Sequence, residues 1–90
     1  MIFMHEIYRM IVCDLDNTLV DSKKQLSAAM IQEMIRLQEK GYLLVIASGR
    51  FIHEIEPVAK ALQIEEHHGI IIACNGFEIY DKKDNSYHRF

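Results

Sequence analysis

Three apolar segments alternate with two segments of helical periodicity, and this alternation constrains the fold more than any other feature of the sequence. The apolar segments, residues 7–13, 42–47 and 70–74, are rich in β-forming residues and have the length of buried strands. Between them, residues 28–40 and 52–62 carry apolar side chains every three or four positions, as amphipathic helices do. Strand, helix, strand, helix, strand with short connections is the βαβ pattern. We therefore expect an α/β fold, a Rossmann-like three-layer αβα arrangement in which a parallel sheet lies between helices.

The residues at the ends of these segments sharpen the expected boundaries. Ser27 is a favourable N-cap for the first helix, and Gly41 supplies the left-handed residue that ends it. Pro57 lacks an N–H and fits best in a first helical turn, so we expect the second helix to bend or to begin twice. Residues 77–90 place apolar residues on both sides of a polar turn, which predicts a β-hairpin. The expected organisation is one partial α/β core over residues 1–76, followed by this hairpin.

Length and charge exclude several classes of protein. Ninety residues form a single domain at most. Ten Lys and Arg residues are outnumbered by thirteen Asp and Glu residues, so a nucleic-acid partner is not expected. Glu6 and Arg9 interrupt the apolar stretch at the start of the sequence, which fits neither a signal peptide nor a membrane anchor. We therefore expect a cytoplasmic protein without a membrane partner, in which Cys13 and Cys74 are unpaired core thiols.

Polar or glycine residues follow all three predicted strands. The first strand is followed by Asp14 and Asp16, the second by Ser48 and Gly49, and the third by Asn75. Ligands of parallel sheets bind beyond the carboxyl ends of the strands, so we expect these residues on one rim. Two carboxylates two residues apart on an extended chain point to the same side, and such pairs tend to have separated pKa values. One carboxylate can then act as a nucleophile or as a ligand for a hard metal ion while the other carries a proton.

The segment Ser48-Gly49-Arg50 has the features of an anion site. Its hydroxyl and backbone N–H groups lie at the predicted start of the second helix. Unpaired N–H groups and the helix dipole favour an anion such as phosphate at that position. Mg²⁺ commonly binds one or two carboxylates together with substrate oxygens, so it would bridge the two aspartates and the phosphate. The sequence therefore indicates Mg²⁺ and phosphate at the same rim.

Simpler interpretations of the same residues stay open at this point. The two acids are also consistent with a pair of loop carboxylates, and Ser48 with the cap of an ordinary strand-to-helix turn. Arg50 could pair with Glu54 one helical turn further on. The adjacent His67 and His68 point apart and have no third ligand spaced near them, which indicates a solvated loop rather than a metal site.

Three segments resemble a known family. Ile-Val-Cys-Asp14-Leu-Asp16-Asn-Thr18 resembles the nucleophile motif of the haloacid dehalogenase (HAD) superfamily, and Val-Ile-Ala-Ser48-Gly49-Arg50 resembles its second motif. The segment Asn75-Gly76-Phe-Glu-Ile-Tyr80-Asp is similar to the one that leads into the cap in the Cof-type phosphatases of this superfamily. The resemblance covers nearly the whole chain and corresponds to the N-terminal part of the HAD core. The hairpin would then lead towards a cap that these 90 residues do not include.

The resemblance implies a Mg²⁺-dependent phosphohydrolase that acts on a small phosphorylated metabolite through an aspartyl-phosphate. Asp14 would attack phosphorus, and Asp16 would protonate the leaving oxygen and then take a proton from the hydrolytic water. Mg²⁺ would be held by the Asp14 carboxylate and the Asp16 backbone carbonyl. Splitting one displacement into two steps is the general advantage of covalent catalysis.

The same resemblance assigns the remaining site residues. Phosphate would be bound by Leu15, Ser48 and Gly49. The site would be supported by Thr18, Arg50 and Asn75. The family also uses a downstream Lys and a later acidic motif, and neither is present in this sequence. The alternative function is therefore a non-catalytic fragment or interaction module whose site is completed by another chain. A phospho-receiver or mononucleotide-binding domain fits the pattern less well, because no glycine-rich loop follows the first strand.

The resemblance also leads to an expectation about association. In the HAD core the first strand is flanked on its far side by strands that come after the cap, so here the strand at residues 7–13 would become an edge. An apolar edge without charges or prolines exposes unpaired backbone groups that favour pairing with another chain. We therefore expect a homo-oligomer formed through this edge.

Overall fold

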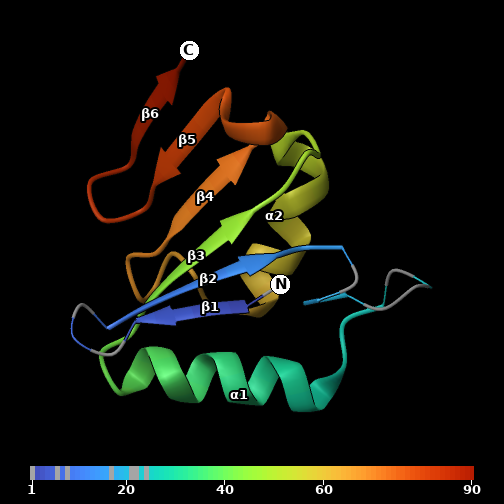
Figure 1. Ribbon diagram of the computed structural model, residues 1–90, viewed down its shortest axis with the longest axis vertical. Helices are drawn as coiled ribbons and strands as arrows, with labels where there is room; N and C mark the ends of the chain where they lie inside the picture. Colours follow the sequence, from blue (N-terminus) through green and yellow to red (C-terminus); the bar gives the residue numbers. More distant parts are fainter. Residues whose placement is uncertain (1, 6, 8, 17, 21–22, 24) are drawn as a thin grey trace.

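A single mixed sheet of six strands, with two helices packed against it, contains most of the described residues (Figure 1). The structure is a computed structural model that describes residues 2–5, 7, 9–16, 18–20, 23 and 25–90. The strands, in their order across the sheet, are β1 (Ile2–His5), β2 (Met10–Asp14), β3 (Leu43–Ala47), β4 (Ile70–Ala73), β5 (Glu78–Asp81) and β6 (Ser86–Arg89). The other elements are the helices α1 (Ala28–Glu39) and α2 (Ile52–Ala61) and a 3-10 turn, η1 (Cys74–Gly76).

Parallel pairing of β2, β3 and β4 forms the centre of the sheet, as the βαβ pattern predicts. Asp14 lies beside Ala47, and Ala47 lies beside Ile72, so the three strands end at the same level. The predicted hairpin is also present, with β5 antiparallel to β4 and β6 antiparallel to β5. The α/β class is therefore confirmed, and the sheet is mixed because antiparallel strands flank its parallel centre.

The expectation for the N-terminal segment is wrong. Arg9 adopts a positive φ of 48°, so the strand predicted over residues 7–13 begins only at Met10. The chain before that point forms β1, which pairs antiparallel with β2 and places Ile2 beside Cys13. Because β1 occupies the far side of β2, the first parallel strand is not an edge of the sheet. The open edge that the expected homo-oligomer requires is therefore covered by β1.

The first helix follows its sequence signals, and the second departs from them. The Ser27 side chain accepts a hydrogen bond from the Met30 N–H (3.1 Å), and Gly41 takes a positive φ of 97° after the helix ends. α2 is one continuous helix that includes the exposed Pro57. The sequence predicts that this helix begins a second time at Pro57, and within this described segment it does not. Among the described residues, neither helix has the length and apolar character that a membrane span requires.

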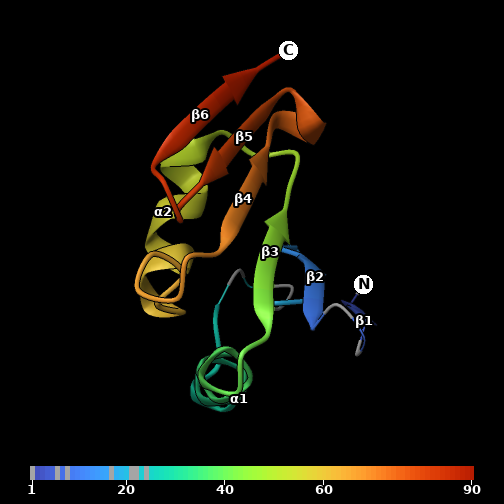
Figure 2. The same ribbon diagram turned by 90° about the vertical axis from the view of Figure 1, so that its left-hand side faces the viewer.

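Both helices lie on one face of the sheet, so the three-layer arrangement is not found in the described chain (Figure 2). The strand residues that face the helices are fully buried, and they are Ile11, Cys13, Leu44, Ile46, Ile71 and Ala73. The parallel strands follow one another in a single direction across the sheet, and right-handed crossovers then bring both helices to the same face. The opposite face carries Val12 and Ile72, both partly exposed, and Phe3, which is 47% exposed.

A buried glutamine joins the two helices. Gln38 of α1 is 4% exposed, and its Nε2 donates to the Leu62 carbonyl at the end of α2 (2.7 Å) and to the Met34 carbonyl (3.2 Å). Its Oε1 is buried without a hydrogen-bond partner among the described residues. The amide thus fixes the position of one helix relative to the other through the backbone rather than through apolar packing alone.

We expect Gln38→Met to lower the free energy of unfolding by about 1 to 3 kcal/mol, because it leaves the buried Leu62 carbonyl without its donor while keeping similar volume. Urea unfolding followed by circular dichroism measures this change. Gln38→Glu is a second variant that introduces a charge at the same buried position and should destabilise more strongly. Equal stability of Gln38→Met and the unchanged chain would contradict the structural role of the amide.

Candidate active site

Two adjoining cavities, both open to solvent, lie at the loops that follow the three parallel strands. The larger, of about 330 Å³, is lined by Asp14, Ala47, Ser48, Gly49, Ile72, Asn75 and Gly76. The smaller, of about 190 Å³, is lined by Asp14, Leu15, Asp16, Ala47, Ser48 and Gly49. Asp14, Ser48 and Gly49 belong to both cavities, so the structure brings together the residues that the sequence placed on one rim.

The aspartate loop turns sharply after β2. The N–H groups of Leu19 and Val20 both donate to the Leu15 carbonyl, at 3.1 and 2.9 Å. Leu15 and Leu19 are buried and anchor the turn in the core, whereas Asp14 stays exposed at the cavity. Thr18 lies within the same turn and is partly buried. The turn therefore presents Asp14 from a rigid support.

Leu15, which is predicted to bind phosphate, already has its side chain and its backbone N–H in contact with other parts of the protein. Its side chain is buried, and its N–H donates to the Ala47 carbonyl at 3.3 Å. This bond continues the pairing of β2 with β3 by one residue. Phosphate binding by the Leu15 backbone would require the loss of this hydrogen bond.

The loop after β3 lies directly before the second helix, where the sequence predicts it. α2 begins at Ile52, two residues after Arg50. The Arg50 N–H donates to Ser48 Oγ (3.0 Å), and the Ser48 N–H donates to the Ile72 carbonyl (2.9 Å). Within the described part of the chain, the Gly49 N–H has no hydrogen-bond partner. The donors that this loop offers to an anion are therefore the Ser48 hydroxyl and the Gly49 N–H.

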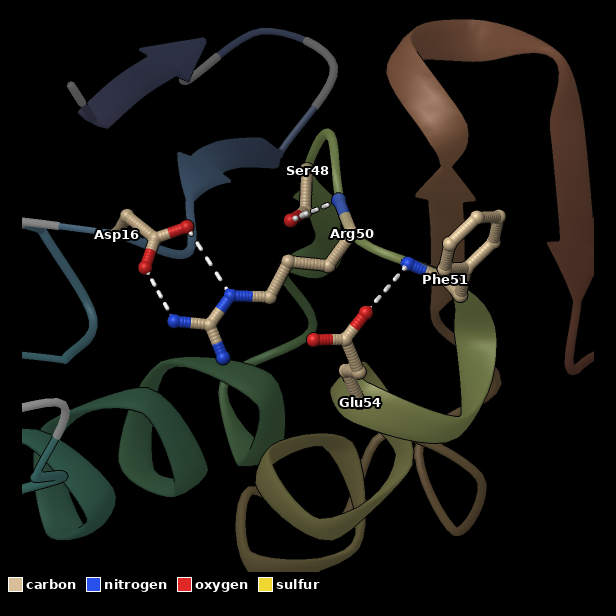
Figure 3. Close-up of polar contacts among 5 residues, drawn as sticks. All are labelled: Asp16, Ser48, Arg50, Phe51 and Glu54. Atoms are coloured by element: carbon tan, nitrogen blue, oxygen red, sulfur yellow. Dashed lines mark hydrogen bonds and ion pairs between the residues drawn. The ribbon is translucent and has the colours of Figure 1, made fainter.

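Arg50 pairs with Asp16, and not with Glu54 (Figure 3). Its Nε donates to Asp16 Oδ2 at 3.2 Å, and its Nη2 donates to Asp16 Oδ1, so the ion pair is bidentate. The hydrogen bonds to this carboxylate raise the pKa of Arg50 above its ordinary value. Glu54 instead accepts a hydrogen bond from the Phe51 N–H (3.3 Å). No local signal predicts the pair, because 34 residues separate its members.

The 3-10 turn η1 closes the rim on the side of β4. The Cys74 N–H donates to the Arg50 carbonyl (2.9 Å), and the Asn75 N–H donates to the Ser48 carbonyl (3.0 Å). The Asn-Gly pair predicts a turn at this position, whereas its bonds to the loop after β3 are visible only in the structure. Asn75 thereby lines the same cavity as Asp14.

The donors at the rim suit a hard cation better than a soft one. Asp14 contributes its carboxylate to both cavities, and the carboxylate of Asp16 is bound to Arg50. Oxygen donors of this kind fit Mg²⁺, which commonly completes its shell with substrate oxygens and water. Among the described residues, no group of three or more His, Cys, Asp or Glu side chains is arranged to hold a metal ion. The His67 Nδ1 lies 3.0 Å from the Gln63 carbonyl, on a separate segment.

Comparison with known proteins adds independent evidence. The family model for haloacid dehalogenase-like hydrolases matches residues 11–89. The pyridoxal phosphate phosphatase YbhA of Escherichia coli is 40% identical over 73 residues, which make up 81% of this chain and 26% of that protein. The phosphatase YwpJ of Bacillus subtilis is 30% identical over 80 residues, or 89% of this chain and 27% of that protein.

Solved structures agree with these sequence matches. A haloacid dehalogenase-like hydrolase from Bacteroides thetaiotaomicron superposes with a TM-score of 0.86 at 41% identity, over 91% of this chain and 31% of that one. A haloacid dehalogenase-like hydrolase from B. subtilis superposes with a TM-score of 0.75 at 30% identity, over 90% of this chain and 27% of that one. The chain thus spans between a quarter and a third of the length of these relatives. It belongs to the family of haloacid dehalogenase-like hydrolases and corresponds to the N-terminal part of their core.

Proposed function

We propose that this chain carries the nucleophile and the phosphate-binding loop of a Mg²⁺-dependent phosphohydrolase that acts through an aspartyl-phosphate. The observation that carries this proposal is the shared cavity lining, to which Asp14 at the end of β2 and Ser48 and Gly49 of the loop after β3 all belong. Family membership supports a hydrolase, and several relatives are phosphatases by name. The substrate is a small phosphorylated metabolite, and the name of YbhA makes pyridoxal phosphate the first compound to test.

Asp14 is the nucleophile in this proposal. A bond forms between its carboxylate oxygen and phosphorus while the bond from phosphorus to the leaving oxygen breaks. Asp16 donates a proton to that leaving oxygen. In the second step Asp16 accepts a proton from water, whose oxygen attacks phosphorus and releases phosphate and the Asp14 carboxylate.

The remaining residues bind the transferring group or support the loops. The Ser48 hydroxyl and the Gly49 N–H donate to phosphoryl oxygens, and both belong to the two cavities that contain Asp14. Leu15 joins them only if its N–H leaves the Ala47 carbonyl. Thr18 belongs to the turn that presents the nucleophile, and Arg50 and Asn75 hold the loop after β3.

Mg²⁺ fits this donor set through the Asp14 carboxylate and the Asp16 backbone carbonyl. When bound, the ion supplies positive charge that offsets the negative charge of the carboxylate and the phosphoryl group. The position of Asp14 in both cavities supports this assignment.

The ion pair with Arg50 places a condition on the role of Asp16. A guanidinium that donates to both carboxylate oxygens favours the ionised carboxylate. This form suits the second step, in which Asp16 takes a proton from water. The first step requires a protonated Asp16, so the carboxyl group has to leave Arg50 before it can act as an acid.

A non-catalytic module completed by another chain is the alternative function. One observation favours it: within the described site, no Lys lines either cavity. A cation near the transferring phosphoryl group typically contributes a factor of hundreds to thousands in rate. The isolated chain should therefore turn over slowly or not at all.

We expect any hydrolysis of para-nitrophenyl phosphate with Mg²⁺ to fall to the uncatalysed rate in Asp14→Asn, because the amide cannot form the aspartyl-phosphate. Absorbance of the released nitrophenolate measures the rate. Glu65→Gln, at an exposed position of the described chain that lines neither cavity, is the matched control and should leave the rate unchanged. Activity that persists in Asp14→Asn would rule out Asp14 as the nucleophile.

We expect a double-mutant cycle of Arg50→Gln and Asp16→Asn to give a coupling free energy of about 0.5 to 1 kcal/mol in urea unfolding at low salt. The Arg36–Glu33 pair is the matched control, because its two side chains are 49% and 48% exposed, against 19% for Arg50 and 48% for Asp16. The less exposed pair should show the larger coupling and lose less of it in high salt. A coupling no larger than that of the control would mean that Arg50 does not hold Asp16 in solution.

A further inference from the structure

Three exposed phenylalanines gather around a further cavity beside the candidate site. Phe51, Phe77 and Phe90 are 62%, 61% and 75% exposed, and they come from the loop after β3, the residue after η1 and the residue after β6. Single exposed apolar residues need no explanation, whereas a group of them in one place marks a binding surface. This aromatic cavity has a volume of about 220 Å³ and is lined by Phe51, Cys74, Phe77, Glu78, Arg89 and Phe90.

Backbone hydrogen bonds hold the three segments of the aromatic cavity together. The Phe90 N–H donates to the Phe77 carbonyl (2.8 Å), which continues the pairing of β5 with β6. The Cys74 N–H donates to the carbonyl of Arg50 (2.9 Å), the residue before Phe51. The backbone that carries the three rings is therefore fixed before any ligand binds, and a preformed site of this kind loses less entropy on binding.

The polar wall of the aromatic cavity is already partnered within the protein. The Glu78 side chain is 16% exposed, and its Oε1 accepts from Cys74 Sγ (3.5 Å) and the Tyr80 hydroxyl (3.3 Å). Its Oε2 accepts from the Tyr87 hydroxyl (3.0 Å) and lies 3.9 Å from Arg89 Nε. A ligand in this cavity therefore meets mainly aromatic rings, whose faces and edges favour contact with another aromatic ring.

One turn of the chain separates the aromatic cavity from the larger cavity that Asp14 lines. Gly76 lines the larger cavity and directly precedes Phe77, and Gly49 lies two residues before Phe51. Because consecutive Cα atoms are 3.8 Å apart, these Cα separations are at most about 4 and 8 Å. Figure 3 shows Phe51 following Ser48 and Arg50 on the same loop. A leaving group attached to a phosphoryl group at the candidate site is thus within reach of the aromatic cavity.

The size of the aromatic cavity suits one ring. Apolar cavities of about 150 Å³ are large enough to hold benzene. The aromatic cavity, at about 220 Å³, has room for a single ring with small substituents.

We propose that the substrate is an aromatic phosphomonoester, whose ring lies in the aromatic cavity while its phosphoryl group lies between Asp14 and Ser48. Phe51 and Phe77 are then the residues that determine specificity for the leaving group. This inference rests on the proposed function, because that function places the phosphoryl group at Asp14. It adds the chemical class of the leaving group and the surface that selects it.

A pair of phosphonates tests this inference without requiring turnover, because their carbon–phosphorus bond is not the ester bond that a phosphatase cleaves. Phenylphosphonate carries the ring and methylphosphonate lacks it. In the presence of Mg²⁺, phenylphosphonate should bind roughly tenfold more tightly, because its ring contacts the three phenylalanines. Titrations followed by amide chemical shifts should show both compounds moving Ser48 and Gly49, and only phenylphosphonate moving Phe77 and Phe90.

A double variant and a matched control locate the ring. Phe51→Leu combined with Phe77→Leu keeps apolar side chains but removes two rings, so it should lose most of the preference for phenylphosphonate and keep its affinity for methylphosphonate. The control is Phe3→Leu, because Phe3 is 47% exposed on β1 and lines none of the three cavities. It should leave both affinities unchanged, and thermal unfolding checks that each variant is folded. A preference that persists in the double variant, or falls equally in the control, would overturn the proposal.

Failure of the proposed function has a different signature. Methylphosphonate that moves neither Ser48 nor Gly49 would count against the phosphatase, and phenylphosphonate that still moves Phe77 and Phe90 would then support the ring site alone. Equal affinity for both phosphonates, with shifts at Ser48 and Gly49 only, would support the phosphatase and overturn the aromatic leaving group. Shifts of Phe77 and Phe90 that depend on protein concentration without ligand would assign the aromatic cavity to a second copy of the chain, which also overturns the proposal.

Discussion

The parallel register of β2, β3 and β4 is the constraint on which the site depends. Because Asp14, Ala47 and Ile72 lie side by side, the three following loops start at one level. Hydrogen bonds then continue the pairing beyond the strands: the Leu15 N–H donates to the Ala47 carbonyl, and the Ser48 N–H donates to the Ile72 carbonyl. Two backbone N–H groups of the turn after β4 also donate hydrogen bonds to carbonyls of the loop after β3. The carboxylate of Asp14 and two hydrogen-bond donors for an anion, at Ser48 and Gly49, thus line the same cavity although they are distant in the sequence. The strands and their continued pairing give these groups a rigid support.

Local patterns predict the parts of this molecule whose physical cause is local. The apolar runs define β3 and β4 to within a residue, because buried strands need continuous apolar side chains. Ser27 and Gly41 define α1 for the same kind of reason. The shared rim follows from strand direction alone, so the sequence is sufficient to predict that Asp14 and Ser48 lie near one another.

Contacts between distant residues lie beyond such patterns. The short β1 has no signal apart from its apolar character, and its pairing with β2 depends on the turn at Arg9. The placement of both helices on one face follows from strand order and not from either helix alone. Likewise, Arg50 has a nearby partner in Glu54 but pairs with Asp16, because the aspartate loop brings that carboxylate within reach of both guanidinium donors.

We propose that Asp14 receives the phosphoryl group, and mass spectrometry of the acid-quenched protein is the decisive measurement. The chain is incubated with para-nitrophenyl phosphate and Mg²⁺, quenched in acid and digested, and the peptides are sequenced. We expect a phosphoryl adduct on the peptide that contains Asp14, and its loss in Asp14→Asn. An adduct on any other residue, or complete substrate turnover without an adduct at Asp14, would contradict it.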